Sequence, residues 1–142
     1  QARAEGGHIL CGGDAVTVSG RCQDGWFVAP TVIEGLPSEA ITNQQEIFGP
    51  VVSLIPFDDE ADALAIANGT GYGLAASLWT GDLSRAHRLG AALDFGIVWI
   101  NCWMLRDLRT PFGGTKQSGL GREGGEEALR FFTEPRNICI RY

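Results

Sequence analysis

The chain has 142 residues, a formal net charge of −6 and 44% hydrophobic residues, which is typical of a globular protein rather than a disordered one. Acids outnumber bases and Lys and Arg do not cluster, which argues against nucleic acid as a partner. No apolar run approaches the roughly 18 residues that span a bilayer, so we expect no membrane association. The 20 glycines follow no three-residue period, which excludes collagen and indicates many tight turns.

The cysteines and the first residues bear on compartment and completeness. The four cysteines lie far apart and form no CxxC pair, so we expect free thiols and a cytoplasmic protein. Residues 1–5 lack the apolar stretch of a secretory signal. Because Gln rather than Met comes first, and residues 2–5 resemble the end of a helix, we expect a piece of a longer protein. The cysteines are Cys11, Cys22, Cys102 and Cys139.

Short strands are expected near the start of the chain. Residues 8–11 and 27–32 are rich in β-forming residues and are separated by a polar, glycine-containing turn at 19–25. They predict two strands beside a loop.

Strands and helices then alternate. Three apolar stretches, 51–57, 74–79 and 96–101, predict strands, and two helices are expected between them, at about 61–68 and 83–93. The acids that precede each helix are suited to accept its free N–H groups. Strand–helix–strand–helix–strand at these lengths predicts a parallel βαβαβ sheet with flanking helices, so the fold class is α/β. The acids are Asp58, Asp59 and Glu60 for the first helix and Asp82 for the second.

The segment after the last of these strands is the expected place for function. In α/β sheets, sites gather in loops beyond the carboxyl ends of the strands, and here that loop is long, from 102 to about 122. A helix is expected over 123–132. Residues 137–142 alternate polar and apolar side chains, as an edge strand does, and such a strand invites a partner strand.

General site motifs are weak in this chain. Residues 119–124 match GxGxxG, but a polar loop rather than a buried strand precedes them, which favours a structural loop over a dinucleotide site. The two histidines, His8 and His87, cannot supply the three or four ligands of a zinc site. Cys102 has no visible base beside it and is expected to be a small apolar residue. We therefore expect no metal and no nucleophile here.

The loop itself leaves alternatives open. Arg106 and Arg109 could hold a substrate carboxylate through charged hydrogen bonds, or could form a local ion pair with Asp107 at the surface. Trp99, Trp103 and Phe112 could line an apolar pocket or fill the core. A stand-alone binding or self-association module without catalysis is also compatible with the residues.

Three segments, 45–51, 68–76 and 111–119 with its extension to Glu123, are more specific. In this order and spacing they resemble the NAD(P)-dependent aldehyde dehydrogenase superfamily, and they correspond to about the last third of a member. Residues 101–112 are most similar to the 2-aminomuconic and 2-hydroxymuconic semialdehyde dehydrogenases. The resemblance implies an oxidoreductase that converts a carboxylated semialdehyde to the acid.

The resemblance also implies roles for individual residues. Glu46 corresponds to the carboxylate that binds the nicotinamide ribose, and Phe48 to the side chain near the nicotinamide ring. Phe112 borders the aldehyde pocket. Arg106, with Arg109 as second choice, would bind the substrate carboxylate. The implied cofactor is NAD, with NADP left open, and these residues are expected to face one cleft.

No residue of this sequence corresponds to the family's nucleophilic cysteine, to its base or to its dinucleotide-binding domain. The resemblance therefore implies that no catalytic residue is present and that the chain alone is inactive. It divides the chain into part of the catalytic domain, 1–132, and a terminal strand of the oligomerisation region, 133–142. A homo-oligomer is expected through that strand.

Overall fold

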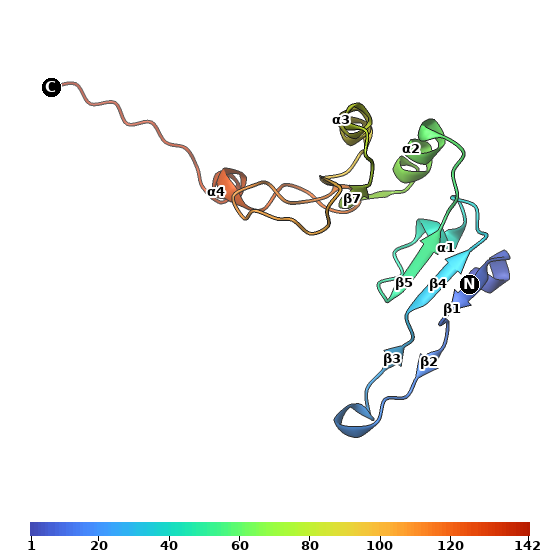
Figure 1. Cartoon of the computed structure of the whole chain (residues 1–142). Coiled ribbons are helices and arrows are strands. Elements are labelled where there is room, and N and C mark those ends of the chain that lie inside the picture. The colour runs from blue at the N-terminus through green and yellow to red at the C-terminus, as the bar shows by residue number, and fades with distance from the viewer. The chain divides into compact units, whose positions relative to one another are not determined.

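Residues 1–142 are all described by the computed structural model, in which the backbone forms two units, Gln1–Gly69 and Thr70–Tyr142 (Figure 1). Each unit contains two sheets, and no sheet has strands from both units. Both helices and strands are present in each unit, so the expected α/β class is confirmed. No helix is both long enough and apolar enough to cross a membrane.

The first unit is built on a three-stranded sheet in the order β1–β4–β5, whose strands lie side by side in Figure 1. Strand β1 (His8–Cys11) lies where the sequence predicts it and runs antiparallel to β4 (Thr31–Glu34). Strand β5 (Val51–Leu54) pairs in parallel with β4. It ends two residues before Pro56, earlier than expected. The core of this sheet consists of Ala2, Ile33 and Leu36, with Ile9, Ala40 and Val51 packed against it.

The single strand expected at 27–32 is wrong, because the structure contains two. Strand β3 (Phe27–Val28) forms a hairpin with β2 (Ala15–Val16), and the chain then passes through Pro30 into β4. Proline has no N–H to donate to a ladder, which ends β3. A 3₁₀ turn (Gly20–Cys22) lies in the expected polar loop at the tip of the hairpin.

A carboxylate joins the start of the chain to α1 (Ile41–Gln44), a short helix that the sequence pattern does not predict. The Thr42 N–H and Oγ1–H both donate to Glu5 Oε2, at 3.2 and 2.6 Å. Glu5 ends a 3₁₀ turn (Ala2–Glu5), and the Thr42 hydroxyl is the main reason that its pKa lies below 4.5. The partners are too far apart in sequence for local patterning to reveal.

Helix α2 (Glu60–Asn68) begins as expected. Asp59 is its N-cap, and its Oδ1 accepts hydrogen bonds from Ala61 N and Asp62 N, each at 2.9 Å. These bonds satisfy two of the backbone donors that every helix start leaves unpaired.

Replacing Asp59 with alanine is expected to lower the free energy of unfolding by about 1 kcal/mol, the usual cost of losing an N-cap. Urea denaturation followed by circular dichroism measures it. Asp58→Ala is the matched control, because it removes the same charge beside the helix while the Asp58 side chain makes no capping bond. Equal losses in the two variants would show that charge rather than capping matters.

The second unit contains the expected strand–helix–strand crossover. Strand β7 (Ala75–Leu78) leads into α3 (Leu83–Ala92), which leads into β8 (Ile97–Ile100). The two strands pair in parallel from Ala75↔Ile97 to Leu78↔Ile100. Asp82 caps α3 as expected, accepting from Arg85 N at 3.0 Å. Strand β5 belongs to the sheet of the first unit, so the strands expected in one sheet are distributed over two.

Two short elements follow. Strand β9 (Thr115–Lys116) pairs antiparallel with β6 (Tyr72–Gly73), and α4 (Gly125–Phe132) starts two residues later than expected. Its start is delayed because Glu123 forms a β-bridge with Phe112 and Gly124 has a left-handed φ of 86°.

The last ten residues, 133–142, form no strand within the chain. Figure 1 shows them extended beyond α4. Ile138 and Ile140 are each 67% exposed. A strand needs a neighbour to pair its N–H and C=O groups, and no other segment of this chain supplies one.

Candidate functional site

The loop between α1 and β5 carries the two residues expected to orient a cofactor. Glu46 and Phe48 both line an open cavity of about 410 Å³. Glu46 also lines a neighbouring cavity of about 440 Å³. Its carboxylate is exposed, and no hydrogen-bond donor of the chain occupies it. The structure therefore places Glu46 and Phe48 around the same cavity.

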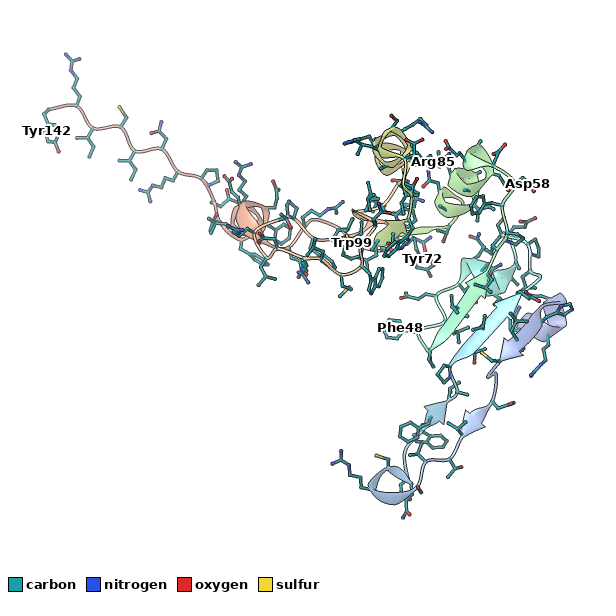
Figure 2. All side chains as sticks on the ribbon, viewed as in Figure 1. Phe48, Asp58, Tyr72, Arg85, Trp99 and Tyr142 are labelled. Carbon is teal, nitrogen blue, oxygen red and sulfur yellow. The ribbon has the colours of Figure 1, made fainter.

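Phe48 has an unusual backbone for a bulky residue. Its φ is 51°, in the left-handed region that phenylalanine rarely adopts, and its side chain is 90% exposed. Figure 2 shows the ring standing out from the loop. No burial or packing of the ring within the chain offsets the free-energy cost of this backbone conformation. Backbone strain of this kind concentrates at ligand-contacting positions.

Asn101 holds the start of the long loop after β8. Its Nδ2 donates to Thr80 O and its Oδ1 accepts from Thr80 N, both at 2.8 Å. Asn101 has a φ of 54°, which asparagine tolerates better than most residues. These two bonds tie the residue that follows β8 to the segment that follows β7, at the start of the long loop. No local pattern in the sequence indicates these bonds, because 21 positions separate the two residues.

The aromatic residues of the loop have different environments. Trp99 is 7% exposed, and its Nε1 donates to Leu105 O at 2.8 Å, so it belongs to the core. Trp103 lies edge-on to it, with ring centroids 5.1 Å apart, but is 64% exposed. Trp99 thus fills the core while Trp103 lies on the surface.

Arg106 and Phe112, two of the expected substrate residues, are in contact. The Arg106 guanidinium lies over the Phe112 ring, 4.0 Å from its centroid, and its Nη2 donates to Glu123 Oε1 at 2.9 Å. Glu123 is the only hydrogen-bond partner of this side chain, which is 35% exposed. In the sequence Glu123 stands out only as part of a motif, and no local signal pairs residues 17 positions apart.

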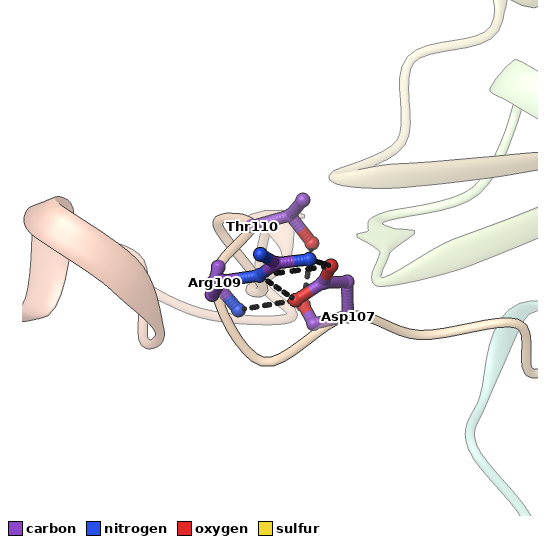
Figure 3. A network of polar contacts seen from close by, with 3 residues as sticks. All are labelled: Asp107, Arg109 and Thr110. Carbon is purple, nitrogen blue, oxygen red and sulfur yellow. Dashed lines mark hydrogen bonds and ion pairs between the residues drawn. The ribbon is translucent and has the colours of Figure 1, made fainter.

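Arg109 is already paired. Its Nε donates to both carboxylate oxygens of Asp107, at 2.9 and 3.1 Å, and its Nη2 also donates to Asp107 (Figure 3). These bonds hold the pKa of Asp107 below its ordinary value and raise that of Arg109. The Arg109 side chain is 89% exposed, so a surface ion pair describes it. Thr110 completes the turn by donating Oγ1–H to Asp107 O at 2.7 Å.

The structure also bears on the GxGxxG match, on the four cysteines and on the expected common cleft. Residues 119–124 form a loop before α4 rather than a turn after a buried strand, so the dinucleotide fingerprint is absent. All four cysteines are free. Glu46 and Phe48 lie in the first unit, while Arg106 and Phe112 lie in the second. That all four face one cleft stays a prediction.

Comparison with known proteins identifies the class of protein. Residues 1–138 match the aldehyde dehydrogenase family, and the chain belongs to that family.

Three relatives make the comparison specific. The 2-aminomuconic 6-semialdehyde dehydrogenase of Pseudomonas sp. is 49% identical over 140 residues, which are 99% of this chain and 28% of that protein. The 2-hydroxymuconic semialdehyde dehydrogenase of Pseudomonas sp. (strain CF600) is 49% identical over 137 residues, 96% of this chain and 28% of that protein. A Mycobacterium tuberculosis aldehyde dehydrogenase, solved in complex with NAD⁺, matches with a TM-score of 0.84 and 41% identity over 94% of this chain and 27% of its own. The chain thus spans less than a third of the length of these relatives.

Proposed function

We propose that this chain supplies a cofactor-orienting loop and a substrate-recognition loop to an aldehyde dehydrogenase that oxidises a carboxylated semialdehyde to the acid with NAD. The observation that carries this proposal is Arg106, whose guanidinium is held over an aromatic ring with most of its N–H groups unpaired. The similarity to relatives named as semialdehyde dehydrogenases supports the same substrate class.

Glu46 and Phe48 fit a dinucleotide with a nicotinamide ribose. An ionised carboxylate can accept hydrogen bonds from two ribose hydroxyls at once, and Glu46 is exposed at the edge of a cavity without a donor from the chain. The strained and exposed Phe48 offers an aromatic face that limits the movement of a planar ring. When bound, NAD would supply the hydride acceptor of the oxidation. NADP would bind through the same two residues.

Arg106 fits a substrate carboxylate. Its Nε and Nη1 make no hydrogen bond in the chain, and its Nη2 donates only to Glu123, so the guanidinium keeps N–H donors that a carboxylate can accept from. Phe112 provides apolar surface beside them. Arg109, whose backbone N, Nε and Nη2 all donate to the Asp107 carboxylate, is the weaker candidate.

The bond-making chemistry is expected from residues outside this sequence. Oxidation of an aldehyde by this family's route requires a cysteine thiolate to attack the carbonyl carbon and a base to activate water. None of the four cysteines has a histidine or other base as a hydrogen-bond partner. We therefore propose that the 142-residue chain alone turns over no aldehyde.

Two further features belong to the proposal. Residues 133–142, extended and without a partner strand in the chain, would pair with another subunit in a homo-oligomer. The four free cysteines are compatible with a reducing cytoplasm.

A chimeric enzyme tests this function. This chain would replace the matching 140 residues of the 2-aminomuconic 6-semialdehyde dehydrogenase of Pseudomonas sp.. We expect the chimera to reduce NAD with 2-hydroxymuconic semialdehyde and to prefer it to hexanal, a neutral aldehyde, while the isolated chain forms no NADH. The unaltered relative is the control. A chimera that prefers hexanal would contradict the substrate class, and turnover by the isolated chain would contradict the external nucleophile.

A further inference from the structure

The backbone places Phe112 and Glu123 directly opposite each other. Phe112 N donates to Glu123 O and Glu123 N donates to Phe112 O, both at 2.7 Å, as in one closely spaced pair of an antiparallel ladder. Side chains of such a pair lie side by side. An aromatic ring and a carboxylate are thus presented together, although 11 positions separate them in the sequence.

The Arg106 guanidinium occupies the space that this pair creates. It stacks on the Phe112 ring at 4.0 Å and donates to Glu123 Oε1 at 2.9 Å. A planar cation held by a ring on one face and a carboxylate at one edge loses most of its rotational freedom. The ring and the carboxylate therefore set the orientation of the guanidinium before any substrate arrives. The Nε and Nη1 groups stay unpaired in this orientation.

Glu123 also opposes the charge that it orients. The Glu123 side chain is 65% exposed, and its negative charge lies within hydrogen-bonding distance of the only cation that it touches. A substrate carboxylate that approached the unpaired N–H groups of Arg106 would meet the positive guanidinium and this second anion together. Orientation and charge therefore act on carboxylate binding in opposite directions.

We propose that Glu123 is a specificity-determining positioning residue, which aims Arg106 at a substrate carboxylate and moderates its attraction for that anion. This inference rests on the proposed function, because it assumes that Arg106 binds the carboxylate. Glu123 acts through Arg106 and need not touch the substrate. The hydrogen bond supplies the positioning, and the negative charge lowers the affinity.

Glu123→Gln separates these two effects, because the amide oxygen can still accept from Arg106 while the charge is lost. The probes are monomethyl muconate, with one carboxylate, and dimethyl muconate, with none, each titrated into the 142-residue chain. Nuclear magnetic resonance of ¹⁵N-arginine-labelled protein would report binding, with the Arg106 Nε–H signal assigned by its loss in Arg106→Ala. Glu127→Gln is the matched control, since Glu127 is an exposed acid of α4 without a contact to Arg106.

We expect Glu123→Gln to bind the monomethyl ester about two- to fivefold more tightly than the unsubstituted chain, with no change for the dimethyl ester or in Glu127→Gln. The gain should shrink at high salt and vanish in an Arg106→Ala background. In Glu123→Ala the Arg106 Nε–H signal should move to the position of a solvent-exposed arginine, and Glu123→Gln should restore it. A merely structural glutamate would affect both esters alike.

The outcomes distinguish this inference from the proposed function. If Arg106→Ala weakens binding of the monomethyl ester but Glu123→Gln leaves it unchanged or weaker, the role of Glu123 is overturned and the role of Arg106 stands. If Arg106→Ala has no effect on binding, or the unsubstituted chain binds neither ester, the substrate role of Arg106 is overturned, and that of Glu123 with it.

Discussion

Gly96→Ala is expected to destabilise the second unit by about 3 kcal/mol, at the upper end of the cost of overpacking. A Cβ at this position would lie 1.6 Å from the Gly113 carbonyl oxygen and 2.7 Å from its carbon. Both clashing atoms are backbone, so no side-chain rotation can relieve them. Gly96 N also donates to Gly73 O at 2.9 Å, just before β8 begins. Relief would have to shift β8 or the segment that leads to β9.

Urea denaturation followed by tryptophan fluorescence measures this effect, because Trp99 is buried in β8. Gly81→Ala is the matched control, since a Cβ there meets nothing within 4 Å and its φ is not left-handed. Its free energy of unfolding should stay within about 0.5 kcal/mol of the unsubstituted chain. Similar losses in both variants would mean that the close approach of Gly96 to Gly113 is not tight in solution.

Arg106→Ala in the chimeric enzyme is expected to lower kcat/KM for 2-hydroxymuconic semialdehyde by about tenfold to a hundredfold. Hydrogen bonds between charged groups contribute roughly 1.5 to 3 kcal/mol, and each 1.4 kcal/mol is a factor of ten. The carboxylate lies away from the reacting carbonyl, so the loss should appear mainly in KM. Hexanal carries no carboxylate, and its kcat/KM should change little.

Steady-state NADH formation with both aldehydes measures the effect, and Arg109→Ala is the control. The Arg109 side chain is exposed and bound to Asp107, so its removal should cost much less than that of Arg106. A greater loss of kcat/KM in Arg109→Ala than in Arg106→Ala would show that Arg109, not Arg106, binds the substrate carboxylate. Equal losses with both aldehydes in Arg106→Ala would show that Arg106 supports the loop rather than the substrate carboxylate.

Features that depend on near neighbours in the sequence could be predicted well. Asp59 and Asp82 cap α2 and α3 as expected, because an N-cap bonds to backbone only two or three residues ahead. The periodicity of apolar residues places β7, α3 and β8 to within about one or two residues of their observed bounds. The split at Pro30 was missed because the β-forming residues on its two sides pair with different strands.

The candidate site was predicted only in part. The aldehyde dehydrogenase motifs identify the loops that carry Glu46, Phe48, Arg106 and Phe112, but they do not show what each side chain contacts. Composition and spacing left Arg106 and Arg109 nearly equivalent, whereas their partners, Glu123 and Asp107, distinguish them. The strain at Phe48 is likewise visible only as a backbone angle.

The amino-acid sequence by itself determined the α/β class, the starts of α2 and α3 and the family, since these follow from short-range backbone bonding and from motifs in order. Only the tertiary structure decided that β5 pairs with β4 rather than with β7, and which of the two arginines keeps donors free. The Glu5–Thr42 and Arg106–Glu123 bonds join residues 37 and 17 positions apart. Contacts of that kind depend on how the folded backbone brings distant segments together, and no local propensity encodes them.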